Sequence, residues 1–222
     1  MSRIANTKAL KGSQNWLQHL VNSAPATVDK LLRPGLRLNK DDEINWLSPL
    51  ASEDYAEYQD QSFLERLSIK LDRRSLGDFW PQRGPVWDGL ATTSRGDVIL
   101  IEAKSHVSEM VSSCQAGEMS EALIEKSLSE AAAHYKADPN ADWLNGYYQY
   151  ANRLAHLYLL RELNNISAWL VFVCFVNDAE MHGPKSVVEW QAAIAEIHRH
   201  LGVNRDSLYP YVVDVFPDVK RL

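Results

Sequence analysis

The apolar run Val98–Ile101 and the charged residues that follow it constrain this chain more than any other segment. A short apolar run rich in β-branched side chains is typical of a strand inside the core. Side chains alternate between the two faces of a strand, so Glu102, Lys104 and, if the strand continues, His106 share one face. A carboxylate and an ammonium are costly to bury unless they pair with each other or bind a metal. The run therefore predicts a central strand with a polar site at its end.

A second acid, Asp88, lies in another extended-looking segment, Val86–Leu90. The turn signature Ser94-Arg95-Gly96-Asp97 connects this segment to the apolar run, and the whole pattern predicts a β-hairpin. In such a hairpin Asp88 lies beside Glu102. The blander interpretation is an aspartate in a turn and a surface ion pair between Glu102 and Lys104.

Two carboxylates and a lysine at one strand end suit metal-assisted hydrolysis of a phosphodiester. Mg²⁺ prefers hard oxygen ligands, and a bound metal makes its water more acidic. Asp88 and Glu102 supply two ligands, and the backbone carbonyl of Ala103 is a candidate for a third. Lys104 is then placed to hold or deprotonate the attacking water and to balance charge in the transition state.

Asp88 followed by Glu102-Ala-Lys104 resembles the active-site signature of the PD-(D/E)xK nuclease superfamily, which has the restriction-endonuclease-like fold. The resemblance covers about residues 52–176. It implies an α/β protein with an αβββαβ core, Asp88 and Glu102 as metal ligands, and Lys104 as the catalytic, water-positioning lysine. It also implies Mg²⁺ or Mn²⁺ as cofactor and nucleic acid as substrate, with DNA as our first choice. One departure is that Trp87, rather than a proline, precedes Asp88.

The resemblance suggests an additional acid in the metal site, because family members often supply one from the first helix of the core. Apolar spacing predicts a helix from Ser52 to about Leu71, which carries Glu57 and Glu65. We choose Glu65 as the metal ligand because apolar residues flank it. The alternative is an ordinary surface charge.

A second predicted helix, from Trp143 to Leu163 with Asp142 as its N-cap, carries a polar stripe at helical spacing. Some nuclease subfamilies place a glutamine on the helix after the lysine strand, with a basic partner one turn later. Gln149 and Arg153 resemble that pair, so Gln149 is a candidate catalytic residue and Arg153 a candidate for substrate binding. The stripe also includes Asn152 and His156, and its alternative interpretation is the solvated side of the helix.

Other candidates for substrate binding lie at the strand end and in a basic stretch upstream of Asp88. His106 could contact a phosphate, or it could simply be hydrogen-bonded near the surface. Arg73 and Arg74 belong to a basic stretch, Arg66–Arg83, that could contact phosphates or form the solvated face of a helix.

The remaining pattern predicts a mixed sheet flanked by helices. Helices are expected over residues 119–136 and from Ser186 to Gly202, and further strands over residues 168–176 and 211–216. Residues 1–50 look irregular, with a short helix near residues 13–21 and a turn at Pro34-Gly35. We expect them to be an N-terminal extension packed on the core, and residues 51–222 to be the nuclease-like α/β domain, in one compact unit.

Composition limits the class of protein. With 222 residues and 45% apolar content the chain can bury one sizeable core. Its net charge of −6 argues against a protein that coats nucleic acid indiscriminately. The run Ile166–Val176 is too short to span a bilayer, and Cys114 and Cys174 lack metal-ligand spacing. We expect a cytoplasmic protein with no membrane partner, and a homodimer stays open.

Three function classes remain open at this point. The first is a Mg²⁺-dependent nuclease. The second is a protein of nuclease fold that binds nucleic acid or a protein partner without cutting, which the acidic composition favours and the intact Asp88, Glu102 and Lys104 oppose. The third is a sugar hydrolase that uses Asp88 and Glu102 as acid and base, which needs no metal and leaves Lys104 without a role.

Overall fold

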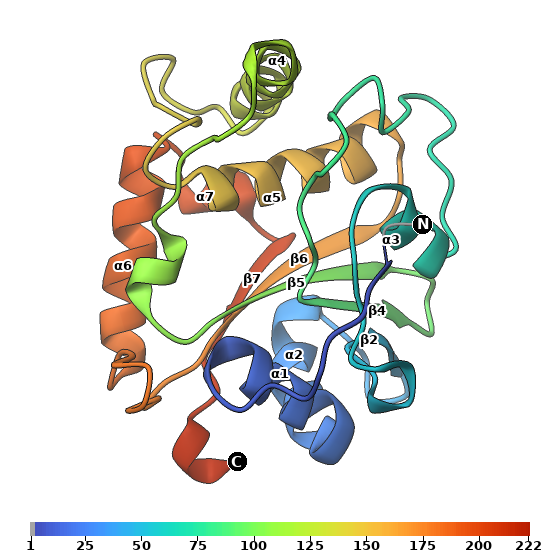
Figure 1. The fold of residues 1–222 in the computed structure, drawn as a ribbon, viewed down its shortest axis with the longest axis vertical. Coiled ribbons are helices and arrows are strands. Elements are labelled where there is room, and N and C mark those ends of the chain that lie inside the picture. The colour runs from blue at the N-terminus through green and yellow to red at the C-terminus, as the bar shows by residue number, and fades with distance from the viewer. Residues whose placement is uncertain (1–2) are drawn as a thin grey trace.

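The computed structural model describes residues 3–222, which form a central five-stranded sheet between two layers of helices (Figure 1). The strands of this sheet are β2 (Ile44–Ser48), β4 (Gly89–Thr93), β5 (Val98–Lys104), β6 (Ala168–Cys174) and β7 (Val212–Val215). A separate two-stranded sheet pairs β1 (Arg3–Ile4) with β3 (Glu57–Tyr58). The α-helices are α1 (Gly12–Ser23), α2 (Pro25–Leu36), α3 (Asp60–Arg66), α4 (Glu118–His134), α5 (Tyr148–Tyr158), α6 (Val187–His200) and α7 (Arg205–Leu208). Short 3₁₀ turns occupy 51–53, 107–110 and 219–221, and a π-helical turn over 159–163 extends α5.

The five-stranded sheet is mixed, with the spatial order β2-β4-β5-β6-β7. Antiparallel pairing joins β2 to β4 and β4 to β5, whereas β5, β6 and β7 run parallel. The predicted hairpin is confirmed, since Gly89 pairs with Ile101 and Thr92 with Val98. The expectation of an α/β protein with a mixed sheet flanked by helices is confirmed as well.

Helices cover both faces of the sheet, which explains why every residue of β5 and β6 is buried. Helices α1 and α2 cover one face, where Leu20 and Leu32 pack in a core with Ile99 and Ile101. Helices α4, α5 and α6 lie on the other face, where Leu154 and others pack with Leu100. Because side chains alternate between the two faces of β5, the strand contributes apolar residues to both cores.

Residues 1–50, which we expected to be an extension packed on the core, supply the edge strand β2 and the helices α1 and α2. The turn expected at Pro34-Gly35 is wrong, because both residues lie inside α2. A Cβ at Gly35 would lie 2.3 Å from Cγ1 of Val213, so the glycine lets α2 approach β7 closely. Apolar spacing at Val28, Leu32 and Leu36 reflects the buried face of this helix.

Two predicted helices are shorter in the structure. The helix expected from Ser52 to Leu71 forms only over Asp60–Arg66, because Asp54 and Tyr55 adopt left-handed backbone angles, with φ of 55° and 49°. The helix expected from Trp143 begins at Tyr148. Asp142 is not its N-cap and instead accepts hydrogen bonds from the backbone N–H groups of Leu144 and Asn145 in a preceding turn. The other predicted helices and strands are confirmed within a few residues.

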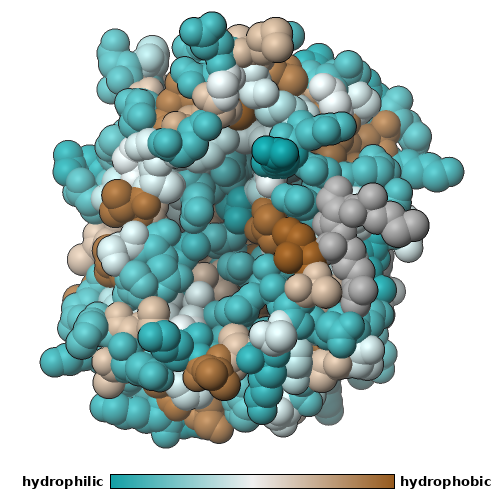
Figure 2. Space-filling view, in the orientation of Figure 1, coloured by the Kyte–Doolittle hydropathy of each residue, from teal (hydrophilic) through white to brown (hydrophobic). Residues whose placement is uncertain are grey.

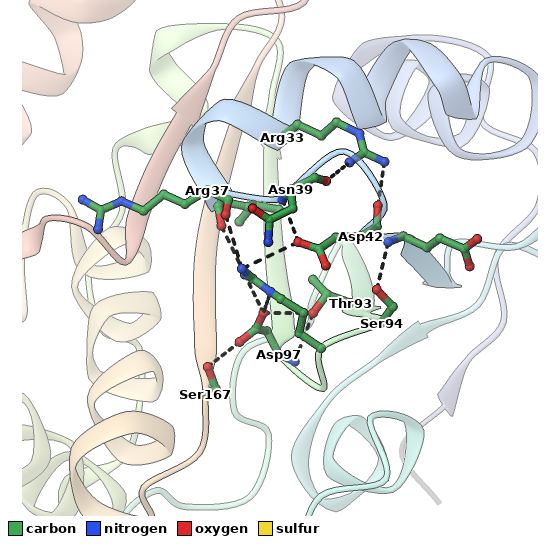
Figure 3. Close-up of polar contacts among 11 residues, drawn as sticks. Arg33, Arg37, Asn39, Asp42, Thr93, Ser94, Asp97 and Ser167 are labelled. Carbon is green, nitrogen blue, oxygen red and sulfur yellow. Dashed lines mark hydrogen bonds and ion pairs between the residues drawn. The ribbon is translucent and has the colours of Figure 1, made fainter.

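A polar network anchors the turn of the hairpin at the end of the sheet opposite the charged strand end (Figure 3). Asp97 accepts hydrogen bonds from Oγ1 of Thr93 at 2.9 Å and from Oγ of Ser167 at 2.5 Å. Arg95 donates to Asp97 at 2.8 Å and also to the last carbonyls of α2. Burial opposes ionisation of Asp97, but these partners outweigh it and lower its pKa. The network ties the hairpin to α2 and to the residue before β6, which fixes the register of β4 on β5.

Candidate functional site

The hairpin register brings Asp88 to the end of β5. Because Gly89 pairs with Ile101, the preceding Asp88 lies beside Glu102. Oδ2 of Asp88 accepts a hydrogen bond from the backbone N–H of Ala103 at 2.7 Å. The carbonyl of Lys104 accepts from the N–H of Phe175 on the other side of the strand, so the backbone groups of Ala103 face Asp88. The strand end therefore combines a carboxylate and a backbone carbonyl at one position.

Two cations bind the carboxylate of Glu102. Nζ of Lys104 lies 2.6 Å from Oε1, and Nη2 of Arg153 lies 2.7 Å from Oε2. All three residues are buried, with exposed fractions of 3% for Glu102, 9% for Lys104 and 5% for Arg153. Burial opposes ionisation of Glu102, but Arg153 and Lys104 outweigh it and lower its pKa. Burial likewise opposes charge on Lys104, and the carboxylates of Glu102 and Asp88 outweigh it and raise its pKa.

Arg153 is held at Glu102 from several sides. Its Nε also donates to Oε2 of Glu102 at 2.7 Å, its Nη2 to the carbonyl of Val86 at 2.9 Å, and its Nη1 to Oδ1 of Asn152 at 2.8 Å. The guanidinium carbon lies 4.8 Å from the centre of the Trp87 ring, in a cation–π contact. Arg153 therefore faces the carboxylate cluster and fixes the position of Glu102.

Glu57 is the further acid at this site, and Glu65 is not. Tyr58 pairs with Trp87 in an isolated antiparallel bridge, which places Glu57 beside Asp88. Glu57 is buried, and its Oε1 accepts from Nε2 of Gln14 at 2.9 Å. Glu65 is exposed on α3 and does not line the cavity described below. The sequence places Glu57 between an apolar and an aromatic residue, Ala56 and Tyr58, and this was the available signal. Both neighbours are buried in the structure.

The neighbouring acids make Asp88 harder to ionise. Burial, the carboxylate of Glu102 and, more weakly, that of Glu57 raise the pKa of Asp88, while Lys104 opposes them. Burial also raises the pKa of Glu57, against the effect of its hydrogen bond from Gln14. The two central carboxyl groups thus have pKa values displaced in opposite directions, an arrangement that is common at functional sites.

Most of the polar stripe of α5 faces the protein interior, since Asn152, Arg153 and His156 are buried, whereas Gln149 at its start is exposed. Gln149 lies beside Lys104, with its Oε1 accepting from Nζ at 3.3 Å, and its backbone N–H donates to Oγ of Ser112 at 2.8 Å. Asn152 lines the cavity described below, and its Oδ1 accepts a hydrogen bond from Nη1 of Arg153. His156 lies deeper, in the apolar core.

Three candidate substrate-binding residues lie apart from this cluster. The strand β5 ends at Lys104 and does not continue to His106, which is the N-cap of the 3₁₀ turn 107–110 and whose Nε2 lies 3.1 Å from Oε1 of Glu109. His106 lines a different cavity, together with Lys11 and Lys185. Arg74 lies 3.8 Å from Glu130 of α4, and the side chain of Arg73 is exposed. Neither arginine lines the cavity that contains Asp88.

Asp88, Glu102, Lys104 and Glu57 line one cavity of about 660 Å³. One wall is the segment 80–86 that leads into β4, and the other is formed by residues 112–117 and the start of α4. Figure 1 shows these two segments running on either side of the space in front of α5. Figure 2 shows this face of the molecule hollowed near its centre, with hydrophilic residues around most of the hollow.

The donors on the cavity floor fit a divalent cation that takes few protein ligands. Within residues 3–222 no group of three or more His, Cys, Asp or Glu side chains gathers at metal-binding distance. Mg²⁺, however, is commonly held by one or two carboxylates and several waters. Asp88, Glu102 and the carbonyl of Ala103 supply such a set. Oδ2 of Asp88 and Oε1 of Glu102 each have one partner and keep a second lone pair, whereas Oε2 of Glu102 takes two hydrogen bonds from Arg153.

Comparisons with protein-family models, with curated proteins and with solved structures each give no match to this chain. Across residues 3–222, no helix combines the length and apolar character needed to cross a membrane.

Proposed function

We propose that this chain is a Mg²⁺-dependent phosphodiesterase of the PD-(D/E)xK type that cleaves nucleic acid, with DNA as the first choice. The observation that carries the proposal is the meeting of Asp88, Glu102 and Lys104 at the floor of one cavity. With β3, α3 and α4 left out, the element order α2-β2-β4-β5-α5-β6 supports it, although α2 and β2 precede the residues 52–176 that the resemblance covers. An αβββαβ core of the restriction-endonuclease-like type places the aspartate at the second strand and the glutamate and lysine on the third.

Asp88, Glu102 and the carbonyl of Ala103 would hold the metal, with Glu57 near enough to bind it through a water. The chemistry that a divalent cation supplies when bound is polarisation of the phosphate and a lower pKa for an attacking water. Mn²⁺ should substitute, since it accepts the same oxygen ligands.

Lys104 has the central role among the protein groups. Its ammonium lies against Glu102 and Gln149, so it is oriented from two sides and can donate a hydrogen bond to a water or a phosphate oxygen. Gln149 positions Lys104 without reacting itself. Arg153 keeps Glu102 ionised and supplies a second fixed positive charge close to where charge develops on the phosphate.

A specific observation favours the alternative, a protein of this fold that binds nucleic acid or a protein partner without cutting. Both oxygens of Glu102 already contact cations, Lys104 at Oε1 and Arg153 at Oε2. If these ion pairs are too stable to share Glu102 with a metal, the site binds without catalysis. A metal titration of the wild-type protein separates the two functions.

The test is incubation with linear, circular and single-stranded DNA in the presence of Mg²⁺, Mn²⁺ or a chelator. We expect cleavage that requires the metal and that Lys104→Ala abolishes. The matched control is Lys70→Ala, at an exposed lysine outside the cavity, which should cleave like the wild type. Absence of cleavage of every substrate by well-folded wild-type protein would refute catalysis, and full activity in chelator would favour a metal-free hydrolase.

The cellular setting stays part of the proposal. Cys114 and Cys174 are both free thiols, which supports a reducing compartment such as the cytoplasm. The homodimer stays a prediction, and sedimentation of the purified protein checks it.

A further inference from the structure

The reacting groups lie below the surface and are reached through the cavity. Glu102 and Lys104 are buried, and the cavity is the space that both line. A phosphate must come within hydrogen-bond distance of Lys104 to react, so the scissile phosphate has to enter the cavity. Its volume of about 660 Å³ is in the range of pockets that enclose a small ligand. A cube of this volume is about 9 Å on a side, whereas the major groove of a double helix alone is about 12 Å wide, so a double helix does not fit inside.

Hydrogen bonds fix the first wall, residues 80–86. The carboxylate of Asp60 accepts from the backbone N–H groups of Arg83 and Gly84, at 3.1 and 2.8 Å. Arg153 donates to the carbonyl of Val86 at the bottom of the wall. Oγ of Ser127 in α4 donates to the carbonyl of Phe79 just before it. The wall is therefore held at its base and near its tip.

The second wall, residues 112–117, is tied to the segment that precedes α5. The N–H of Ser112 donates to the carbonyl of Gly146 at 2.8 Å, and the N–H of Cys114 to that of Leu144 at 2.8 Å. The carbonyl of Ser112 accepts in turn from the N–H of Tyr148 at 3.1 Å. Opening the cavity wide enough for a duplex would break these bonds in one wall or the other.

The chemistry of the walls suits exposed bases better than a double-stranded backbone. Above the floor their polar side chains are amides, hydroxyls and one arginine, from residues Gln82, Arg83, Ser112, Ser113 and Gln115, and Tyr148 at the start of α5 adds another hydroxyl. Strong binding to duplex phosphates needs several cations, and the whole chain has a net charge of −6. Amide and hydroxyl groups instead match the hydrogen-bonding edges of bases, which are free in unpaired nucleotides.

We propose, on the basis of the proposed function, that the cavity takes a single strand or an unpaired end of nucleic acid and excludes intact duplex. One or two unpaired nucleotides enter between the walls and bring one phosphate to Lys104. The rest of the strand lies along the hollowed face. A covalently closed duplex has no single strand or unpaired end that could enter the cavity.

The first test measures binding, so that it does not depend on catalysis. Fluorescence anisotropy in chelator compares a labelled single-stranded DNA 30-mer with the same sequence in a duplex closed by hairpins at both ends. We expect at least about tenfold tighter binding of the single strand, a difference of about 1.4 kcal/mol. A single-stranded RNA arm tells which sugar is preferred. Equal or tighter binding of the closed duplex, or binding of neither DNA, would overturn the inference.

The second test measures cleavage with Mg²⁺ on the same DNAs and on a duplex with an unpaired tail. Cuts should fall in the single strand and at the tail, at least about 100-fold faster than in closed duplex, a barrier difference of about 2.7 kcal/mol. Equal rates on closed duplex would refute the inference and leave the proposed function standing. Cleavage of no DNA, with selective binding of the single strand, would refute the catalytic proposal alone.

A variant that fills the cavity mouth provides an independent readout. Ser113→Trp places a bulky side chain on the second wall, and the matched control is Ser129→Trp at an exposed position of α4 outside this cavity. With melting temperatures alike, Ser113→Trp should weaken single-strand binding at least about tenfold and the control should not. Equal binding by both variants would show that the strand does not enter between the walls.

Discussion

His156 should make the stability of this protein depend on pH. The imidazole is 1% exposed and lies among four aromatic rings, with its centre 4.8 Å from that of Trp80 and 6.0 Å from that of Trp87. Its Nδ1 lies 2.8 Å from the carbonyl oxygen of Asn152, which can only accept, so Nδ1 carries the proton of a neutral ring. Burial lowers the pKa of His156 to about 3, against the effect of that hydrogen bond.

The sign follows from comparison of the two states. An unfolded histidine titrates near pH 6.5, so between about pH 3 and 6.5 the unfolded chain binds a proton that the folded chain does not. The contribution to stability is complete above this range and is lost as the pH falls. A pH of 5 lies about 1.5 units below the pKa of the unfolded histidine, and each unit corresponds to about 1.36 kcal/mol. The free energy of unfolding should therefore be about 2 kcal/mol lower at pH 5 than at pH 7.5.

The assay is urea unfolding at pH 7.5 and 5.0 for the wild type and His156→Gln. The variant lowers stability at both values because it disturbs the core, so the informative quantity is the change between them. The wild type should lose about 2 kcal/mol more than the variant on acidification. His182→Gln is the matched control, because that histidine is exposed, and it should behave as the wild type does. An equal pH dependence in His156→Gln and wild type would refute a neutral, buried His156.

Four further results are expected. Arg153→Met breaks a buried ion pair with Glu102 and should lower the free energy of unfolding by about 3–5 kcal/mol, whereas Arg153→Lys keeps a cation there and should lose less, both measured by urea unfolding. Glu57→Gln should raise the Mg²⁺ concentration for half-maximal cleavage by about 10–100-fold, and Glu65→Gln should leave it unchanged. Because burial and Glu102 raise the pKa of Asp88, protons compete with the metal for this carboxylate. The Mg²⁺ concentration for half-maximal cleavage should therefore fall as the pH rises from about 6 to 9. Asp97→Ala should cost roughly 1–3 kcal/mol at neutral pH in thermal melts, and the difference from wild type should shrink below about pH 4, where the unfolded carboxyl is protonated.

The parts of the fold that could be predicted are those that a short stretch of neighbouring residues specifies. The hairpin followed from the turn signature at residues 94–97 and the apolar run after it, because pairing across a short turn needs no information from the rest of the chain. Helix α6 followed from Ser186, whose side chain accepts from the N–H of Glu189 as an N-cap should. Each of these signals lies within a few residues of the structure it specifies.

Where the prediction failed, contacts between distant segments decide the structure. Glu57 reaches the site through the bridge between Tyr58 and Trp87, which joins residues that the sequence separates widely. Its spacing fits a helix equally well, and left-handed backbone angles at Asp54 and Tyr55 exclude that helix. The polar stripe of α5 was visible in the sequence, but helical periodicity cannot tell a stripe that faces water from one that faces a polar cavity.

The charge on the cavity floor links these observations to a function. Three carboxyl groups, those of Asp88, Glu102 and Glu57, face two cations, Lys104 and Arg153, so full ionisation leaves one excess negative charge in a largely buried site. A proton on Asp88 removes that excess, and this is one reason why the pKa of Asp88 is raised. Exchange of this proton for a divalent cation makes the floor positive by one charge, the complement of one phosphodiester. With the proton the floor has no net charge and adds little to the binding of phosphate, whereas with the metal it attracts phosphate, so Mg²⁺ should strengthen binding of the reacting phosphate as it makes the site ready to cut.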